Sequence, residues 1–411
     1  MSGTERLYYA DSTRLSFEAS VVAHRTLHPG EGHPGEGHPG EGGPRQGVVL
    51  DRSAFYPESG GQMADHGQLL VAGAAFSVDD VQAHGDDVVH FGAGVLPALG
   101  ETVVGDVDRT RRRIHMALHS GQHILSRALS LEAQAETTSS RLGESACTID
   151  VDRERLQDDQ IQRALDLANS LIDDDVAIRS FFPTAEELAS LPLRKEATVD
   201  GPVRVVQIGD FDVTPCGGTH CIRSGQVGLV DILQIERHKQ RLRLTFVAGP
   251  RGRRELSEQA RILRSLAKSC SSAPDRLADA VAKLSADGKI LRQQLVALED
   301  ALATELAGRL ERRGDLRLGD LGTLPASVAR AVVKRAASEE GAVVIVGTQG
   351  DDGWLTIAAR GPGSHFDCRA FVTALNEVAE GRGGGRPERA EARLSHPGPW
   401  SSLVDRALAV L

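Results

Sequence analysis

Two short motifs in the sequence carry side chains that bind metal ions. His119 and His123 stand four residues apart within 111–132, a segment whose pattern predicts a helix. That spacing places both imidazoles on one helix face, with about 5–6 Å between their Cβ atoms. Farther along, Cys216 and His220 bracket Gly-Gly-Thr, and glycines let the backbone turn tightly enough for both side chains to converge. Three nitrogens and one thiolate form a plausible tetrahedral shell for Zn²⁺, and the thiolate favours zinc over magnesium or calcium.

Neither motif is specific by itself. Two histidines on one helix face are often core residues, and an isolated Cys-x-x-x-His turn is equally weak evidence. Their combination, with small residues in each motif, predicts one zinc ion per chain held by His119, His123, Cys216 and His220. His115 lies one turn before His119, and each such turn rotates a side chain by about 40° off the face. We therefore assign His115 a structural or supporting role.

The order of the helices and strands that must position these residues predicts an α+β fold. Loose period-two patterns at 4–25, including Tyr8-Tyr9, and short strands with glycine turns from 48 to about 107 predict a small β-barrel. After the helix at 111–132, strands are expected at 136–152, 203–208, 229–235 and 242–247, and an amphipathic helix at 158–175. This mixture predicts helices packed on a mostly antiparallel sheet.

A low-complexity insertion interrupts the barrel region. The pentad HPGEG occurs at 28–32, 33–37 and 38–42. Proline and glycine at this density form neither helix nor buried strand, so a disordered loop extension is expected. A histidine-rich tract that collects metal is the alternative interpretation.

From 255 to 312 the pattern becomes helical, with Pro274 opening the longer second part and Gly314 ending it. Apolar residues recur there with a spacing of seven over more than three heptads, with one weak layer at Gly288. Two interpretations stay open: a helical hairpin inside one chain, and an intermolecular coiled coil that makes a homodimer through 274–305. The heptad positions are Leu277, Val281, Leu284, Gly288, Leu291, Leu295, Leu298 and Leu302.

The remainder, 316–411, reads as a small α/β domain. The apolar run 342–346 predicts a buried strand, 354–358 alternates as its neighbour, and 367–379 is expected to be helical. The segment 381–388, GRGGGRPE, is expected to be a glycine-rich loop.

Composition excludes several classes of protein. The chain has 411 residues, 40% of them hydrophobic and 25% charged, which is globular composition rather than disorder. We see no signal peptide and no apolar run near the ~18 residues of a membrane span, so no membrane partner is expected. The net charge of −10 argues against non-specific coating of long nucleic acid. Five scattered cysteines do not form a disulfide framework, which points to a reducing cytoplasm.

The chain resembles the long form of the AlaX family of freestanding alanyl-tRNA editing proteins. These proteins are similar to the editing and C-terminal parts of alanyl-tRNA synthetase. The matching segments run from about residue 6 to 390. They are FYPESGGQ at Phe55–Gln62, HMALHSGQHILS at His115–Ser126, LGE with TID between Leu142 and Asp150, LRK at Leu193–Lys195, CGGTH at Cys216–His220, and GGGRPE at Gly383–Glu388, which resembles the signature loop of a DHH-associated domain.

The resemblance implies four domains. These are 1–107, an N-terminal β-barrel; 108–250, a zinc-dependent editing core; 251–314, a helical coiled-coil linker; and 315–411, a domain similar to the DHH-associated domain. It also implies a zinc shell made of the four residues named above.

The activity implied is hydrolysis, in trans, of tRNA(Ala) mischarged with serine or glycine. Backbone N–H groups of Gly217 and Gly218 are then expected to stabilise the oxyanion. Gln122 and Thr219 are expected either to read the serine hydroxyl or to cap the local backbone. Gln62 is expected either to act at the site or to fix its own glycine-rich turn, and Asp212 to orient a histidine ligand or form a turn.

Two other functions remain open. One is a non-catalytic module that binds zinc or tRNA, and the other is a zinc hydrolase for another aminoacyl-tRNA ester, such as a threonyl species. The segment Ser139-Ser140-Arg141 departs from the family pattern, which leaves the choice between serine and glycine open. Four protein ligands are also more typical of structural zinc, whereas catalytic zinc usually keeps one position for water.

Overall fold

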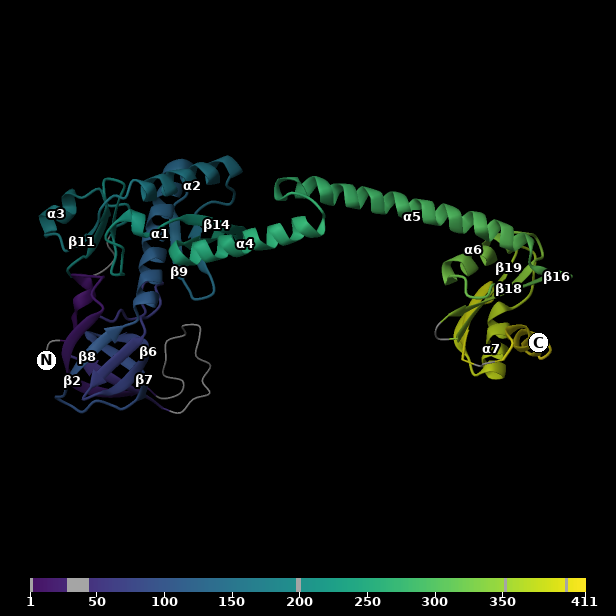
Figure 1. Cartoon of the computed structure of the whole chain (residues 1–411), viewed down its shortest axis with the longest axis horizontal. Helices are drawn as coiled ribbons and strands as arrows, with labels where there is room; N and C mark the ends of the chain where they lie inside the picture. Colours follow the sequence, from purple (N-terminus) through teal and green to yellow (C-terminus); the bar gives the residue numbers. More distant parts are fainter. Residues whose placement is uncertain (1–2, 28–43, 197–200, 351–352, 396–397) are drawn as a thin grey trace. The chain divides into compact units, whose positions relative to one another are not determined.

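The computed structural model describes residues 3–27, 44–196, 201–350, 353–395 and 398–411, and it forms two compact units (Figure 1). The first unit is Met1–Leu263 and the second is Arg264–Leu411. The repeat at 28–42 lies outside the described residues. The division into four domains stays a prediction, because these two units are larger than the four proposed domains and do not separate them.

The predicted β-barrel is present in the first unit. Six antiparallel strands close on themselves in the order β2-β3-β7-β6-β5-β8. Their bounds are β2 Ser16–Leu27, β3 Arg45–Leu50, β5 Gly67–Val71, β6 Ala74–His84, β7 Asp87–Gly94 and β8 Thr102–Val107. Every second side chain of β8 is buried, as expected for strands that face a barrel core on one side.

The start of the chain differs from the prediction. Tyr8 and Tyr9 belong to a 3₁₀ helix, η1 (Leu7–Tyr9), and not to a strand. Before it, β1 (Glu5–Arg6) pairs in parallel with β4 (Arg52–Ser53). Tyr8 is buried against Tyr56 with 5.3 Å between ring centroids, so tertiary aromatic packing overrides the local period-two pattern.

Helix α1 (Arg109–Ala133) leads from the barrel into the second part of this unit (Figure 1). The Asp108 carboxylate caps its start by accepting hydrogen bonds from the backbone N–H groups of Thr110 and Arg111. Most side chains from His115 to Leu129 are buried. The helix is therefore central to the core rather than a surface helix with one apolar stripe.

Two antiparallel sheets contact α1. The first has the order β14-β15-β10-β9 and the second β11-β12-β13. The bounds are β9 Thr137–Leu142, β10 Cys147–Val151, β11 Ile178–Phe181, β12 Val205–Ile208, β13 Asp212–Pro215, β14 Val230–His238 and β15 Arg241–Ala248; the helices are α2 Asp158–Asp173, α3 Ala185–Ser190 and the 3₁₀ turn η2 Ser224–Gln226. The α+β prediction holds for this core, although β11, β13 and α3 were not foreseen.

A buried ion pair joins the barrel to α1. Arg112 is 1% exposed and Asp65 is 0% exposed. The guanidinium donates Nε–H to both Asp65 carboxylate oxygens at 3.0 and 3.2 Å, and Nη2 also contacts this carboxylate. It further donates to the backbone carbonyls of Ser12 at 2.7 Å and Ala54 at 2.5 Å. Arg112 therefore points into the fold, although it lies in the basic run Arg111-Arg112-Arg113 at the start of the helix.

Two helices follow the core, α4 (Gly249–Ser269) and α5 (Leu277–Gly308), with the 3₁₀ turn η3 (Pro274–Arg276) before α5. Pro274 opens the second part as predicted, but the helix ends at Gly308, and Gly314 instead forms the turn of the next hairpin with φ of +64°. Most heptad side chains of α5 are exposed, for example Leu284 at 59% and Leu298 at 68%. Among the described helices, none combines the length and the apolarity that crossing a membrane requires.

The second unit contains a six-stranded sheet of order β16-β17-β18-β19-β21-β20. Only β17 and β18 are parallel. The bounds are β16 Glu311–Arg313, β17 Leu316–Asp320, β18 Val343–Gly350, β19 Gly353–Arg360, β20 Arg382–Arg386, β21 Arg389–Leu394, α6 Ala326–Ala336, α7 Cys368–Ala379 and α8 Trp400–Leu408. The buried strand at 342–346, its antiparallel neighbour and the helix at 367–379 agree with the sequence analysis.

The prediction of a glycine-rich loop at 381–388 is wrong for most of these residues. Residues 382–386 form β20, which pairs with β21 across a tight turn at Pro387 and Glu388. A Cβ atom on Gly383 would lie 2.1 Å from the carbonyl oxygen of Glu391, and one on Gly385 would lie 2.4 Å from that of Arg389. The glycines therefore permit close backbone pairing, which a count of turn-forming residues cannot distinguish from a loop.

We predict that Asp65→Ala destabilises the first unit by about 3–5 kcal/mol, because it leaves the Arg112 charge buried without its carboxylate. Unfolding in denaturant, monitored by circular dichroism, reports the stability of the whole chain. Tryptophan emission reports the second unit alone, because Trp354 and Trp400 are the two tryptophans of the chain.

The matched control for Asp65→Ala is Asp159→Ala, which breaks an exposed i,i+4 pair with Arg163 and is expected to change stability little, because solvent screens an exposed pair. The dichroism transition of Asp65→Ala should move to lower denaturant while the tryptophan transition stays in place. Equal shifts for the two variants would contradict the structural role of the buried pair.

Candidate metal centre

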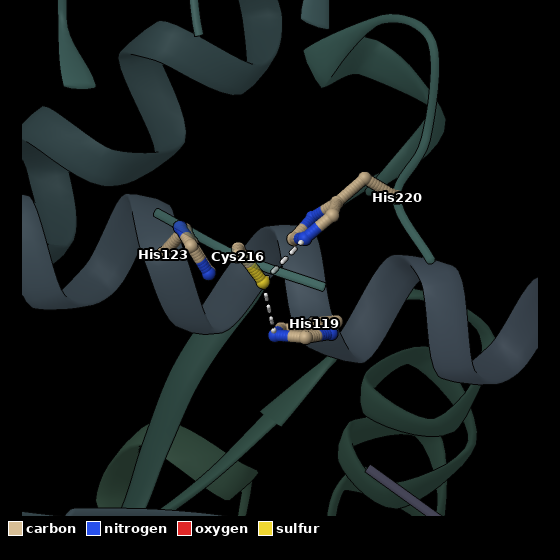
Figure 2. A group of neighbouring side chains, drawn as sticks. All are labelled: His119, His123, Cys216 and His220. Atoms are coloured by element: carbon tan, nitrogen blue, oxygen red, sulfur yellow. Dashed lines mark hydrogen bonds between the residues drawn. The ribbon is translucent and has the colours of Figure 1, made fainter. Parts of the chain in front are cut away.

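The structure brings together His119, His123, Cys216 and His220 from two elements (Figure 2). His119 and His123 lie one turn apart on α1, and Cys216 and His220 lie on the loop that follows β13. One ligand atom from each side chain lies within 4.8 Å of the others. The three histidines are buried and Cys216 is partly exposed. Figure 2 shows the imidazoles arranged around the cysteine sulfur.

The distances in this cluster fit a zinc ion. The Cys216 Sγ atom lies 3.5 Å from His119 Nε2 and 3.3 Å from His220 Nε2. Zinc bonds of about 2.0–2.1 Å to nitrogen and about 2.3 Å to sulfur at tetrahedral angles separate neighbouring ligands by about 3.5 Å. A soft thiolate with three imidazoles also matches the chemistry of zinc. The residues thus fit the metal, and its binding stays a prediction.

Each of the three imidazoles has a polar neighbour at its outer nitrogen. His119 Nδ1 lies 2.8 Å from Gln62 Oε1, and His220 Nδ1 lies 3.2 Å from Ser120 Oγ. His123 Nδ1 lies 3.5 Å from a carboxylate oxygen of Asp212. Such neighbours orient a ligating ring and fix its tautomer, which leaves Nε2 for the metal.

Gln62 reaches the cluster from the loop between β4 and β5 of the barrel. Its Oε1 accepts from His119 Nδ1 and from the backbone N–H of Thr219 at 3.1 Å, while its Nε2 donates to Thr219 Oγ1 at 2.8 Å. The side chain is fully buried. Of the two roles that the sequence left open, the structure therefore places Gln62 against the cluster of candidate metal ligands rather than only within its own turn.

The loop from Cys216 to His220 is held tightly against α1. Arg204 donates Nη1–H to the carbonyls of Cys216 and Gly218, both at 2.9 Å. A Cβ atom on Gly218 would lie 2.1 Å from His119 Cε1, so only glycine fits there. The Gly218 N–H donates to Cys216 Sγ at 3.4 Å. It therefore stabilises a thiolate here, whereas the sequence analysis had assigned it to a reaction oxyanion.

Electrostatics favour the ionised forms of the acidic groups. Burial opposes ionisation of the Cys216 thiol, but the charges of His119, His220 and His123 outweigh it and hold its pKa well below the usual range. Burial likewise raises the pKa of Asp212, but the nearby His123 imidazole and the hydrogen bonds from Arg194 lower it to about 2. A thiolate is the form of cysteine that binds metal.

The neighbouring Cys221 has the opposite environment. Burial raises the pKa of its thiol to about 11, only partly offset by a hydrogen bond with Ser120. It lies outside the cluster and stays a neutral thiol at physiological pH. The two cysteines, five residues apart, thus form a natural comparison between a candidate metal ligand and a thiol outside the cluster.

The other predicted residues lie around the cluster. Gln122 is buried and donates Nε2–H to Ser126 Oγ at 2.8 Å, and Gly217 is exposed on the same loop as Cys216. His115 faces a separate cavity that Arg111 and Arg251 also line. The departing segment 139–141 forms part of β9, next to the loop that carries Gln62.

Two residues important for this site were not singled out by the sequence analysis. Ser120 lies between the histidines of α1, and its hydroxyl also accepts from the backbone N–H of Cys221 at 3.0 Å. Arg204 lies in the apolar run Val203–Ile208. The signal for Arg204 was its charge, because the pattern of the surrounding residues predicts a buried strand.

We predict about one zinc ion per purified chain, lost in Cys216→Ala and kept in Cys221→Ala. The reason is that Cys216 is the one thiolate of the cluster, while Cys221 lies outside it. Elemental analysis of the wild type and both variants measures this directly. Zinc retained at full occupancy in Cys216→Ala would contradict the assignment.

We also predict that Gln62→Ala weakens zinc binding by about 10- to 100-fold, the usual loss when the partner of a ligating histidine is removed. Competition with a chelator measures the affinity. Gln68→Ala is the control, because Gln68 is a barrel residue that bonds Asp106 instead. Equal affinities for the two variants would show that Gln62 does not orient His119.

Two family models match parts of the chain. Residues 28–111 match the model described as tRNA synthetases class II (A). Residues 203–245, which include the CGGTH motif, match the second additional domain of threonyl and alanyl tRNA synthetases.

Whole proteins show the same relationship. An alanine–tRNA ligase of Archaeoglobus fulgidus is 30% identical over 98% of this chain, which spans 43% of that protein. The alanyl-tRNA editing protein AlaX-L of Pyrococcus horikoshii is 37% identical over 51% of this chain and 53% of its own length. The chain thus spans less than half the length of the ligase and matches about half of AlaX-L.

Among solved structures, the C-Ala domain of Aquifex aeolicus alanyl-tRNA synthetase covers 23% of this chain and 91% of its own, at 17% identity and a TM-score of 0.21. A similarity at this level supports no conclusion about the fold. The sequence similarities alone confirm what the motifs indicated: the chain resembles AlaX-type alanyl-tRNA editing proteins and, along nearly its whole length, alanine–tRNA ligases.

Proposed function

We propose that this protein is a trans-editing hydrolase that deacylates Ser-tRNA(Ala), and also Gly-tRNA(Ala), at a site with one zinc ion. The observation that carries the proposal is the cluster of three imidazoles and one thiolate at ligand spacing. The resemblance to alanyl-tRNA editing proteins supplies the substrate class.

The chemistry of alanine selection gives such a site a purpose. A pocket shaped for alanine cannot exclude glycine, which is smaller, and one added hydroxyl is a weak handle for rejecting serine. A second, hydrolytic site removes both errors after they occur. Ester hydrolysis needs water and a polarised carbonyl but no nucleotide cofactor, and a bound zinc ion would polarise the ester carbonyl as a Lewis acid.

In this proposal the chain's own residues fix the geometry before substrate arrives. Gln62, Ser120 and Asp212 hold the three imidazoles, and the Gly218 N–H stabilises the thiolate. Because the Gly217 backbone is exposed on the same loop, we assign its N–H to the developing oxyanion. Gln122 and Thr219 remain the polar groups that we propose for reading the serine hydroxyl.

Two alternatives each have one supporting observation. Four protein side chains at ligand spacing resemble a closed structural zinc shell, which favours a non-catalytic zinc or tRNA-binding module. The match at 203–245 is to a domain of both threonyl and alanyl tRNA synthetases, which favours a hydrolase for another aminoacyl-tRNA ester. Measured activity on defined substrates separates all three.

For partners and location, we propose tRNA(Ala) as the substrate carrier, a homodimer through 274–305 and action in the cytoplasm. The exposed heptad leucines of α5 support self-association, because a second helix would cover them. The described cysteines are all free, and a reducing compartment would keep Cys216 available as a thiolate.

We predict that the zinc-loaded protein releases serine and glycine from tRNA(Ala) faster than alanine. Deacylation of radiolabelled Ser-, Gly- and Ala-tRNA(Ala) measures the three rates. Cys216→Ala should lower serine release by more than about 100-fold, because losing a partner of a ligand already costs about 10- to 100-fold. Cys221→Ala should keep the wild-type rate.

Two results would contradict the proposal. Zinc-loaded protein that releases none of the three amino acids would favour the non-catalytic module. Faster release of threonine from its own tRNA than of serine from tRNA(Ala) would favour the other hydrolase.

A further inference from the structure

The four-stranded sheet of the first unit has one buried face and one polar face. On the buried face, side chains of β9, β10, β15 and β14 pack into the core with α1 and α2. Residues that pair across the strands share a face, so the register also defines the opposite side. We call this side the polar face; it consists of Ser139 and Arg141 from β9, Thr148 and Asp150 from β10, Arg241, Arg243 and Thr245 from β15, and Gln234, Glu236 and His238 from β14.

The hairpin between β14 and β15 concentrates positive charge, although the chain as a whole carries a net charge of −10. This basic hairpin, residues 236–243 with the sequence ERHKQRLR, contains four cations and one glutamate. One of the cations, Arg243, is neutralised by Asp150, whose carboxylate accepts its hydrogen bonds at 2.7 and 2.9 Å. The other three are exposed and form no ion pair within the described part of the chain. They are Arg237, Lys239 and Arg241.

The tip of the basic hairpin holds a lysine in an unfavourable backbone conformation. His238 pairs with Arg241, so Lys239 and Gln240 form a two-residue turn. Lys239 has a φ of +59°, in the left-handed region that glycine usually occupies in such turns. A side chain is disfavoured there because its Cβ atom approaches the following carbonyl oxygen. The hairpin thus keeps a cation at its tip where glycine would fit better, and strained residues cluster at functional sites.

The chemistry of this surface fits a polyanion with many phosphates. Exposed lysine and arginine side chains bind the backbone of nucleic acids, largely by releasing its counterions. Neutral hydroxyls such as those of Thr148 and Thr245 commonly accompany the cations at such a backbone. A surface for another protein is expected to bury apolar or aromatic side chains at its centre, and the polar face contains none. The surface therefore fits RNA better than it fits a protein.

We propose that the basic hairpin and the polar face bind the phosphate backbone of the tRNA. The opposite face of the same sheet packs in the core with α1, the helix that carries His119 and His123. The polar face therefore lies on the side of the sheet away from these residues, and it holds the body of the RNA rather than its reacting end. This inference rests on the proposed function, because that function supplies the tRNA as partner.

Filter binding of uncharged tRNA(Ala) to the full-length protein, over a range of salt concentrations, tests the proposal without hydrolysis. Lys239→Gly removes one cation, so it should weaken binding by about 5- to 10-fold at about 0.1 M salt and lower the salt slope by about one. Its thermal unfolding should stay close to that of the wild type, because the relieved turn offsets the flexibility that glycine adds to the unfolded chain. Lys239→Arg keeps the charge and should keep the affinity.

The matched control is Ala72→Gly. Ala72 also lies in a two-residue hairpin turn, between β5 and β6, and has a φ of +46°. Glycine relieves the same kind of strain there without removing a charge, so this variant should bind tRNA like the wild type. Replacing two cations together, Arg237→Gln with Arg241→Gln, should weaken binding by about 25- to 100-fold, because each lost contact multiplies the effect.

Two results would overturn the proposal. One is equal tRNA affinity for Lys239→Gly and Ala72→Gly. The other is displacement of tRNA by poly-glutamate at an equal concentration of charge, because the hairpin would then accept an acidic protein as readily as RNA. Unchanged binding by Lys239→Gly in an active deacylase rejects the RNA surface alone. The expected binding pattern in a protein that deacylates nothing supports the RNA surface and rejects the hydrolase.

Discussion

The buried pair between Arg112 and Asp65 is the constraint on which the candidate metal centre depends. Asp65 follows Gln62 by three residues, and Arg112 precedes His119 by seven, which is about two helical turns on one face. The ion pair and the contact between Gln62 and His119 therefore link the same barrel loop to the same face of α1. A shift of the barrel against the helix would separate both pairs at once, so the barrel acts as part of the site's scaffold.

The cluster also shows how one site is assembled from distant segments. The outer nitrogens of the imidazoles face Gln62 from the barrel, Ser120 from α1 and Asp212 from β13. Asp212 is itself held by Arg194 at 2.7 Å and by the hydroxyl of Thr214 at 2.9 Å. The ligand atoms are thus oriented before any metal arrives, which reduces the ordering that binding must impose.

Local patterns predicted the parts of this molecule in which local chemistry decides the structure. The helix at 111–132, the barrel strands and the histidine spacing follow from periodicity, and the choice of the four clustered residues as candidate ligands follows from metal chemistry. Tertiary packing decided the rest. Tyr8 leaves the strand pattern to pack on Tyr56, Arg112 turns inward to meet Asp65, and the glycines of β20 serve close pairing. The role of Gln62 required knowing that a barrel loop and α1 meet, which no spacing within one motif reveals.

The glycine strand β20 has a consequence for how the second unit behaves in a crowded solution. It lies at the open edge of the six-stranded sheet, and its five residues, Arg382–Arg386, are all exposed. An edge strand whose three central residues are glycines offers a smooth backbone template on which another chain could add a strand. Arg382 and Arg386 place a positive charge at each end of that template. Repulsion between like charges then opposes antiparallel pairing of two such edges, so the arginines act as gatekeepers against fibrillar self-assembly.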